Sequence, residues 1–185
     1  MVTARAQLWD VAIEQHGYVT QADARALGID RLTVDMLVAR NQLDRAAHGV
    51  YHLPQMPASR YDPYALAVLW TGTPSACLSH DTALAAYEVC DINPGRIHVT
   101  VPAARRIRRR GGDRYVVHRQ DLDPAQVTWW QQIPTVTLAT AMAQSSATRV
   151  PGYLLRQALE SGRRRGELSA AHAHTLEVAL DARDA

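Results

Sequence analysis

Five arginines stand within six residues, where the chain reads RRIRRR. Arginine side chains form paired hydrogen bonds with phosphate and carboxylate oxygens. This segment therefore fits a nucleic acid, a nucleotide or an acidic protein surface, and the alternative is a solvated loop between two strands. Because like charges this close repel one another, we expect a functional patch that contacts phosphate or a partner. Its members are Arg105, Arg106, Arg108, Arg109 and Arg110.

Four cysteine and histidine residues in the middle of the chain are candidate zinc ligands. They are Cys77, His80, Cys90 and His98. Only Cys77 and His80 have the short spacing that zinc sites usually contain, and two of the four fall inside predicted helices or strands. Buried cysteine is also common without a metal. We therefore expect packing and capping roles for these residues, and no metal ion.

No residue pattern indicates catalysis. Ser79, His80 and Asp81 are adjacent in sequence, but a catalytic triad seldom has this geometry, and Ser79 fits better as the N-cap of a helix. All 20 basic residues are arginine. The lack of lysine excludes Schiff-base enzymes, phosphate-binding loops with a lysine and nucleases with a lysine in their motif. The sequence therefore predicts no catalytic residue and no cofactor.

The first 50 residues contain the elements of a winged helix. Apolar residues at helical spacing precede His16-Gly17, which ends a first helix. Thr20 and Asp23 form a capping-box pattern for a short second helix, and Asp30 can cap a third that runs to about residue 40. Two short strands at 43–46 and 50–53 then predict a hairpin, the wing.

A winged helix of this kind contacts the base edges of DNA with its third helix and the phosphates or minor groove with its wing. The residues that we expect to contact DNA point away from the apolar stripe of the third helix, lie on the wing, or begin the second helix. They are Thr20, Gln21, Arg31, Thr33, Arg40, Arg45 and His48. Residues 1–55 nevertheless hold five arginines and six acidic residues, a net charge of −1, although phosphate neutralisation supplies most nonspecific DNA affinity.

Prolines between residues 54 and 63 indicate a linker. We therefore place a winged helix-turn-helix domain at 1–55 and a second domain at 62–185. In the second domain, 64–70 and 80–89 are predicted helices and 97–101, 114–118 and 127–133 predicted strands, followed by three helices, the first capped by Thr137. The fold class is mixed α/β, of the α+β kind.

The chain has 185 residues, of which 47% are hydrophobic, and a net charge of +2. No apolar run approaches the roughly 20 residues that cross a bilayer, and the N-terminus lacks the pattern of a secretory leader. We therefore expect a cytoplasmic protein with no membrane partner.

The order of several segments resembles the AbiEi-type antitoxins, transcriptional regulators of type IV toxin-antitoxin systems. The resemblance spans almost the whole chain, and each segment alone is a weak signal. The segments are GYVTQADARALGI (17–29), LDRAAHGVYHLP (43–54), LSHDTALAAYEV (78–89), RIHVTVP (96–102), IPTVTLATAMA (133–143) and LLRQALESGRRRGELS (154–169).

The resemblance implies an N-terminal winged helix that binds inverted repeats in its own promoter as a homodimer and represses transcription. It also implies a C-terminal domain that counteracts a nucleotidyltransferase-like toxin, its cognate partner. The alternatives are a metal-dependent nuclease or other nucleic-acid enzyme, and a transcription factor whose second domain senses a ligand.

Overall fold

The computed structural model describes residues 3–184, which form an α+β protein with two compact units. The first unit consists of Met1–Ala76, Arg106–Gly112 and Gln131–Ile133. The second unit consists of Cys77–Arg105, Asp113–Trp130 and Pro134–Ala185. The chain therefore passes from the second unit into the first and back again at the arginine segment.

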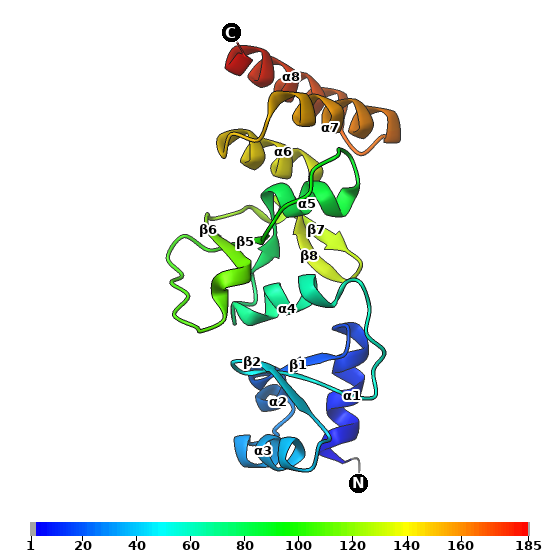
Figure 1. Ribbon diagram of the computed structural model, residues 1–185, viewed down its shortest axis with the longest axis vertical. Helices are drawn as coiled ribbons and strands as arrows, with labels where there is room; N and C mark the ends of the chain where they lie inside the picture. The colour runs from blue at the N-terminus through cyan, green and yellow to red at the C-terminus, as the bar shows by residue number, and fades with distance from the viewer. Residues whose placement is uncertain (1–2, 185) are drawn as a thin grey trace. The chain divides into compact units, whose positions relative to one another are not determined.

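The first unit has the helices and the hairpin of a winged helix (Figure 1, blue to cyan). Its sheet has the order β1-β3-β2, and both pairs of strands are antiparallel. The elements are α1 (Ala4–Glu14), β1 (Tyr18–Thr20), α2 (Gln21–Ala26), α3 (Arg31–Ala39), β2 (Asp44–Ala47), β3 (Val50–His52) and α4 (Asp62–Trp70).

The predicted start signals of these helices are confirmed. The Thr20 hydroxyl accepts a hydrogen bond from the Asp23 N–H, and the Asp23 carboxylate accepts one from the Thr20 N–H, which completes the capping box of α2. The Asp30 side chain caps α3 by accepting a hydrogen bond from the Thr33 N–H. Gly17 adopts a φ of +82°, and a Cβ there would lie 2.7 Å from His52 Nε2, so no other residue fits this turn.

The sequence prediction misses one strand of the first unit and places one of its helices, predicted at 64–70, in the second domain. Tyr18–Thr20 forms the strand β1, which pairs with β3 and adds a third strand at the edge of the sheet. Helix α4 lies beyond the prolines of the predicted linker, yet it contacts all three strands of this sheet and belongs to the first unit. The compact unit therefore extends to Ala76.

The core of the first unit lies between its helices and its sheet. Because α1 and α3 each have one apolar stripe, they bury Leu8, Val34 and Leu37 against the sheet. The buried cluster comprises Leu8, Ala12, Val19, Ala24, Ile29, Val34, Leu37, Leu43, Tyr51 and Leu53.

The second unit contains most of a five-stranded sheet and a group of helices. The sheet order is β6-β5-β4-β8-β7, with β4 antiparallel to β5 and β5 parallel to β6. The strands are β4 (Cys77–Leu78), β5 (Ile97–Val101), β6 (Tyr115–Arg119), β7 (Val127–Trp130) and β8 (Ile133–Val136). The helices are α5 (His80–Tyr87), α6 (Leu138–Ala147), α7 (Gly152–Arg165) and α8 (Ala170–Asp184), and two short 3-10 turns cover Gly112–Arg114 and Pro124–Gln126.

The prediction of a single strand over 127–133 is wrong. Residues 127–133 are two strands, β7 and the start of β8, separated by Gln131-Gln132. Both glutamines have positive φ, the geometry of a two-residue hairpin turn that usually contains Asn or Gly. Without those residue types, the turn gives no sequence signal.

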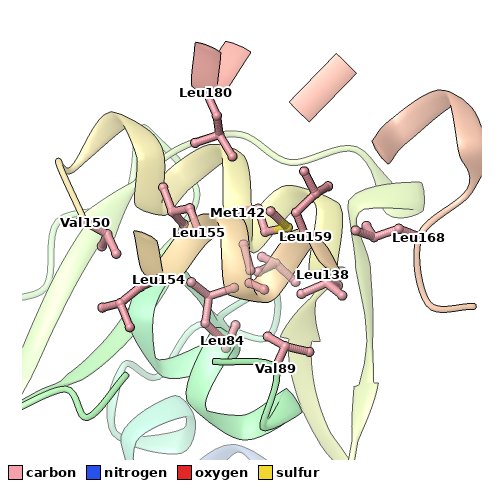
Figure 2. Close-up of a cluster of buried hydrophobic side chains, with 14 of the residues drawn as sticks. Leu84, Val89, Leu138, Met142, Val150, Leu154, Leu155, Leu159, Leu168 and Leu180 are labelled. Carbon is pink, nitrogen blue, oxygen red and sulfur yellow. The ribbon is translucent and has the colours of Figure 1, made fainter. Parts of the chain in front are cut away.

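Four helices of the second unit share one apolar core (Figure 2). Leu154, Leu155 and Leu159 of α7 gather with Leu84 of α5 and Met142 of α6. The Thr137 side chain caps α6, as predicted. Gly166, with a φ of +71°, is the C-cap that ends α7. Among residues 3–184, no helix is long and apolar enough to cross a membrane.

Candidate nucleic-acid interface

Helix α3 turns an exposed face away from the core of the first unit. Val34 and Leu37 are buried, whereas Arg31, Leu32 and Met36 are exposed. Leu32 is 68% exposed and Met36 is one turn further along the same face. The sequence analysis named only polar residues here and missed these two. Apolar side chains on a recognition helix can contact the methyl group of thymine.

The N-termini of α2 and α3 are already capped by carboxylates. Thr20 Oγ1 donates a 2.7 Å hydrogen bond to Asp23, and the Thr33 N–H donates one of 2.7 Å to Asp30. The backbone hydrogen bond from Thr33, and then its side chain, lower the pKa of Asp30 because they stabilise the carboxylate. A phosphate at either helix end would therefore meet a negative charge. Gln21 is half-buried and accepts a hydrogen bond from Tyr51.

Asp35 connects the third helix to the wing. Its carboxylate lies 3.7 Å from Arg31 Nε on the same helix and 3.1 Å from Arg45 Nη2 on β2. The Arg45 guanidinium also lies over the Tyr51 ring, 5.3 Å from its centre. Two of the expected DNA-contacting arginines are thus gathered around one acidic residue.

The wing is the hairpin of β2 and β3. It turns at His48-Gly49, where Gly49 has a φ of +69°, and a bulge in β2 lies between Arg45 and Ala47. His48 is exposed at the turn, and Arg40 is exposed at the end of α3. Arg40 therefore lies where the chain leaves α3, and His48 lies at the tip of the hairpin.

The arginine segment lies against the wing within the first unit. Arg109 Nη1 donates hydrogen bonds to the carbonyl of Trp70, at 2.8 Å, and to the carbonyl of His48, at 3.2 Å. The indole N–H of Trp70 donates in turn to the Arg110 carbonyl, at 2.9 Å. Gly72 leaves the space that the Arg109 guanidinium occupies, since a Cβ there would collide with it. Arg109 is therefore an anchor that attaches the segment to the turn of the wing.

This attachment changes the net charge of the first unit. Residues 1–76 hold six arginines and seven acidic residues, and Arg106–Gly112 adds four arginines and no acidic residue. The first unit thus has a net charge of +3, in place of the −1 of residues 1–55. Arg106, Arg108 and Arg110 are exposed, whereas Arg109 is half-buried. Arg105 falls in the second unit, outside this group.

The cysteine and histidine candidates do not gather as the sequence pairs them. Cys77 is buried in the core of the second unit, where burial raises the pKa of its thiol to about 12. Burial also raises the pKa of Cys90. Ser79 takes the predicted N-cap position of α5, but its hydroxyl bonds to His80 Nδ1 and not to the helix backbone. His80 and His98 instead approach His118, which the sequence analysis had placed only as part of a strand.

Comparison with known proteins bears on the first unit. Residues 7–54 match the family described as "Transcriptional regulator, AbiEi antitoxin". This match confirms the resemblance for the segment that holds α1 to β3. No curated protein matches the chain in sequence.

One solved structure is similar to nearly the whole chain. It is the crystal structure of the RV2827C protein from Mycobacterium tuberculosis, with a TM-score of 0.56 and 18% sequence identity. The likeness covers 95% of this chain and 72% of the other. At this identity it shows a shared fold and nothing about activity.

Proposed function

From the match of residues 7–54 to the AbiEi antitoxin family of transcriptional regulators, we propose that the chain represses its own promoter in the cytoplasm. Two copies bind inverted repeats in double-stranded DNA, each with α3 in the major groove and the wing along the backbone. The protein acts by occupying DNA, and it catalyses no reaction.

The docked arginine segment is the observation that supports DNA binding best. DNA affinity comes largely from the neutralisation of phosphates by basic side chains. A winged helix with a net negative charge offers few such side chains. Arg109 holds the segment on the wing, so Arg106, Arg108 and Arg110 extend the positive surface of the same unit. These three arginines contact phosphates in the proposal.

Base reading is assigned to the exposed face of α3 and to the wing. Arg31 and Arg45 are the residues best able to form paired hydrogen bonds with guanine. Leu32 and Met36 provide apolar contact with the bases. Arg40 and His48 contact the DNA phosphate backbone beside these bases. Thr33, Thr20 and Gln21 contribute least, because their side chains bond within the unit.

The salt dependence of binding tests the role of the arginine segment. We expect the full chain to bind its own upstream DNA with an affinity that falls steeply as salt rises. In the double variant Arg106→Ala/Arg108→Ala, two phosphate contacts are lost, so the slope of log K against log salt should flatten by about two. The preference for the upstream DNA over unrelated DNA should remain, because phosphate contacts carry no sequence information. Fluorescence anisotropy over a range of salt concentrations measures both quantities.

The matched control removes the same charge from the second unit. Arg96 and Arg164 are exposed there, and the variant Arg96→Ala/Arg164→Ala should keep the slope of the unmodified protein. An unchanged slope in the Arg106/Arg108 variant, or an equal loss in the control, would refute the phosphate contacts.

The antitoxin part of the proposal concerns the second unit. The family description names an antitoxin. We therefore propose that the second unit, which consists of Cys77–Arg105, Asp113–Trp130 and Pro134–Ala185, counteracts a cognate nucleotidyltransferase-like toxin. Co-expression with a toxin of this class from a neighbouring reading frame should restore growth. The Arg31→Ala/Arg45→Ala variant should still restore growth from a foreign promoter, because DNA binding is then not needed. Rescue that fails with the unmodified chain would refute this part and leave the DNA-binding part standing.

A further inference from the structure

Three histidines of the second unit bring their ring nitrogens together. They are His80, His98 and His118, and one ring nitrogen from each lies within 4.8 Å of the others. His118 Nε2 lies 3.2 Å from His98 Nδ1. The rings of His80 and His118 stack with 3.5 Å between their centres, so one ring has to rotate for both lone pairs to point at the same ion. His80 is buried, and the other two are half-buried.

The sheet register explains how these residues meet. In the parallel pair of β5 and β6, His98 is opposite Val116 and His118 is opposite Thr100. The two histidines are therefore diagonal neighbours on the same face of the sheet. His80 begins α5 directly after β4, and the preceding Ser79 donates its N–H to the His98 carbonyl. This bond holds the start of α5 beside the strand that carries His98.

We propose that His80, His98 and His118 bind one divalent transition-metal ion, for which Zn²⁺ is the best-suited metal. Imidazole nitrogen is a ligand that zinc prefers, and three protein ligands with an open fourth position form a known type of zinc site. Tetrahedral ligands about 2.05 Å from zinc are about 3.3 Å from each other. The 3.2 Å between His98 and His118 matches this edge. The proposal replaces the expectation of no metal, which considered cysteines and left out His118.

The charge around the rings is suited to a cation. Burial lowers the pKa of His80 to about 3 and of His118 to about 4, and burial also lowers the pKa of His98. A neutral imidazole ring keeps the lone pair that a metal needs. The Asp81 carboxylate raises the pKa of His98 and His118 against this trend, and its buried Oδ1 has no hydrogen-bond partner. A bound cation would balance this carboxylate.

Hydrogen bonds orient the first of these rings. His80 Nδ1 is 3.0 Å from the Ser79 hydroxyl, which leaves Nε2 to coordinate. The backbone N–H of His80 donates to the Gln144 side-chain oxygen, and the Gln144 side-chain NH₂ donates to Gln120. Ligating histidines usually have such a partner on the second nitrogen, which fixes their tautomer. His80 also has a φ of +52°, so its backbone is held in a conformation that histidine seldom adopts.

Zinc titration of the full chain tests the site. After removal of metal by a chelator, the protein should bind one Zn²⁺ per chain in isothermal titration calorimetry and should not bind Mg²⁺, which prefers oxygen ligands. Changes beside a ligand typically cost about 10- to 100-fold in metal affinity. We therefore expect His98→Gln and His118→Gln to lose about 100-fold or more, and Asp81→Asn to lose about 10-fold. X-ray absorption of the zinc-loaded unmodified protein should show nitrogen ligands and no sulfur.

Two kinds of control make the result specific. His172 and His174 are exposed on α8, so His172→Gln/His174→Gln should bind zinc as the unmodified chain does, and so should Cys90→Ser. Circular dichroism without metal checks that the variants fold. The X-ray absorption measurement uses the unmodified protein, so its result does not depend on the folding of any variant. The proposal is overturned if the unmodified chain binds no zinc in a saturable way, if sulfur is a ligand, or if a folded His118→Gln variant keeps full affinity.

Discussion

Asp35 is the residue that limits the positive charge of the recognition helix. It pairs with Arg31 and Arg45, the two arginines assigned to base reading. Both pairs are exposed, so each adds little to the stability of the fold. Under the proposed function their larger effect is on DNA binding, because a carboxylate on this face repels phosphate and occupies donors that would otherwise bind bases.

Removal of this carboxylate charge is therefore expected to strengthen DNA binding. In Asp35→Asn, affinity for unrelated DNA should rise by roughly threefold to tenfold and its salt slope should steepen by about one, because one repulsive charge is gone. The free energy of unfolding should change by less than about 1 kcal/mol. Anisotropy titrations and urea unfolding measure these effects.

The control for this change is Asp10→Asn, an exposed carboxylate on α1 of the same unit. It should leave DNA affinity nearly unchanged, since α1 lies outside the proposed interface. Weaker binding in Asp35→Asn would contradict the prediction and would indicate that the ion pairs hold Arg31 and Arg45 in their binding conformation.

At the scale of elements, local signals determined what could be predicted from the sequence. The capping box at Thr20, the N-caps Asp30 and Thr137 and the turn at Gly49 involve neighbouring residues, so the elements that they delimit were recognisable. Strand β1 has three residues and gains its structure from pairing with β3, about 30 positions later. The turn at Gln131-Gln132 uses residue types that rarely signal a hairpin.

Contacts between residues far apart in the chain explain why the sequence did not predict the histidine cluster or the anchor of the arginine segment. His98 and His118 share a face only because β5 and β6 are parallel and in a fixed register, and no spacing along the chain reveals this. The anchor of the arginine segment is formed by two backbone carbonyls, of His48 and Trp70, whose positions depend on the tertiary fold. The residue types were visible in the sequence, and their partners were not.

At the scale of the whole molecule, the first unit, to which we assign DNA binding, is completed by residues that come much later in the chain. The winged helix and α4 account for residues 1–76, which are net acidic, and the four arginines of Arg106–Gly112 reverse the sign. The order of the elements along the chain would assign these arginines to the second domain. The hydrogen bonds of Arg109 and Arg110 attach the segment to the first.

A fragment of residues 1–76 should therefore bind DNA much more weakly than the full chain. It keeps α3 and the wing but has a net charge of −1 in place of +3. Loss of the three exposed arginines at 106, 108 and 110 should flatten the salt slope by about three. Paired anisotropy titrations of the fragment and the full chain, on the same upstream DNA, measure the difference.

Circular dichroism and thermal unfolding must first establish that the fragment folds. Its buried cluster lies within residues 8–53, so the core of the unit is retained. A second fragment, in which residues 106–112 follow residue 76 through a flexible Gly/Ser linker, restores the charge without the rest of the second unit. If that fragment regains the steep salt slope, the arginine segment alone supplies the missing phosphate contacts. If the plain fragment already binds as the full chain does, the docked segment has no part in DNA binding.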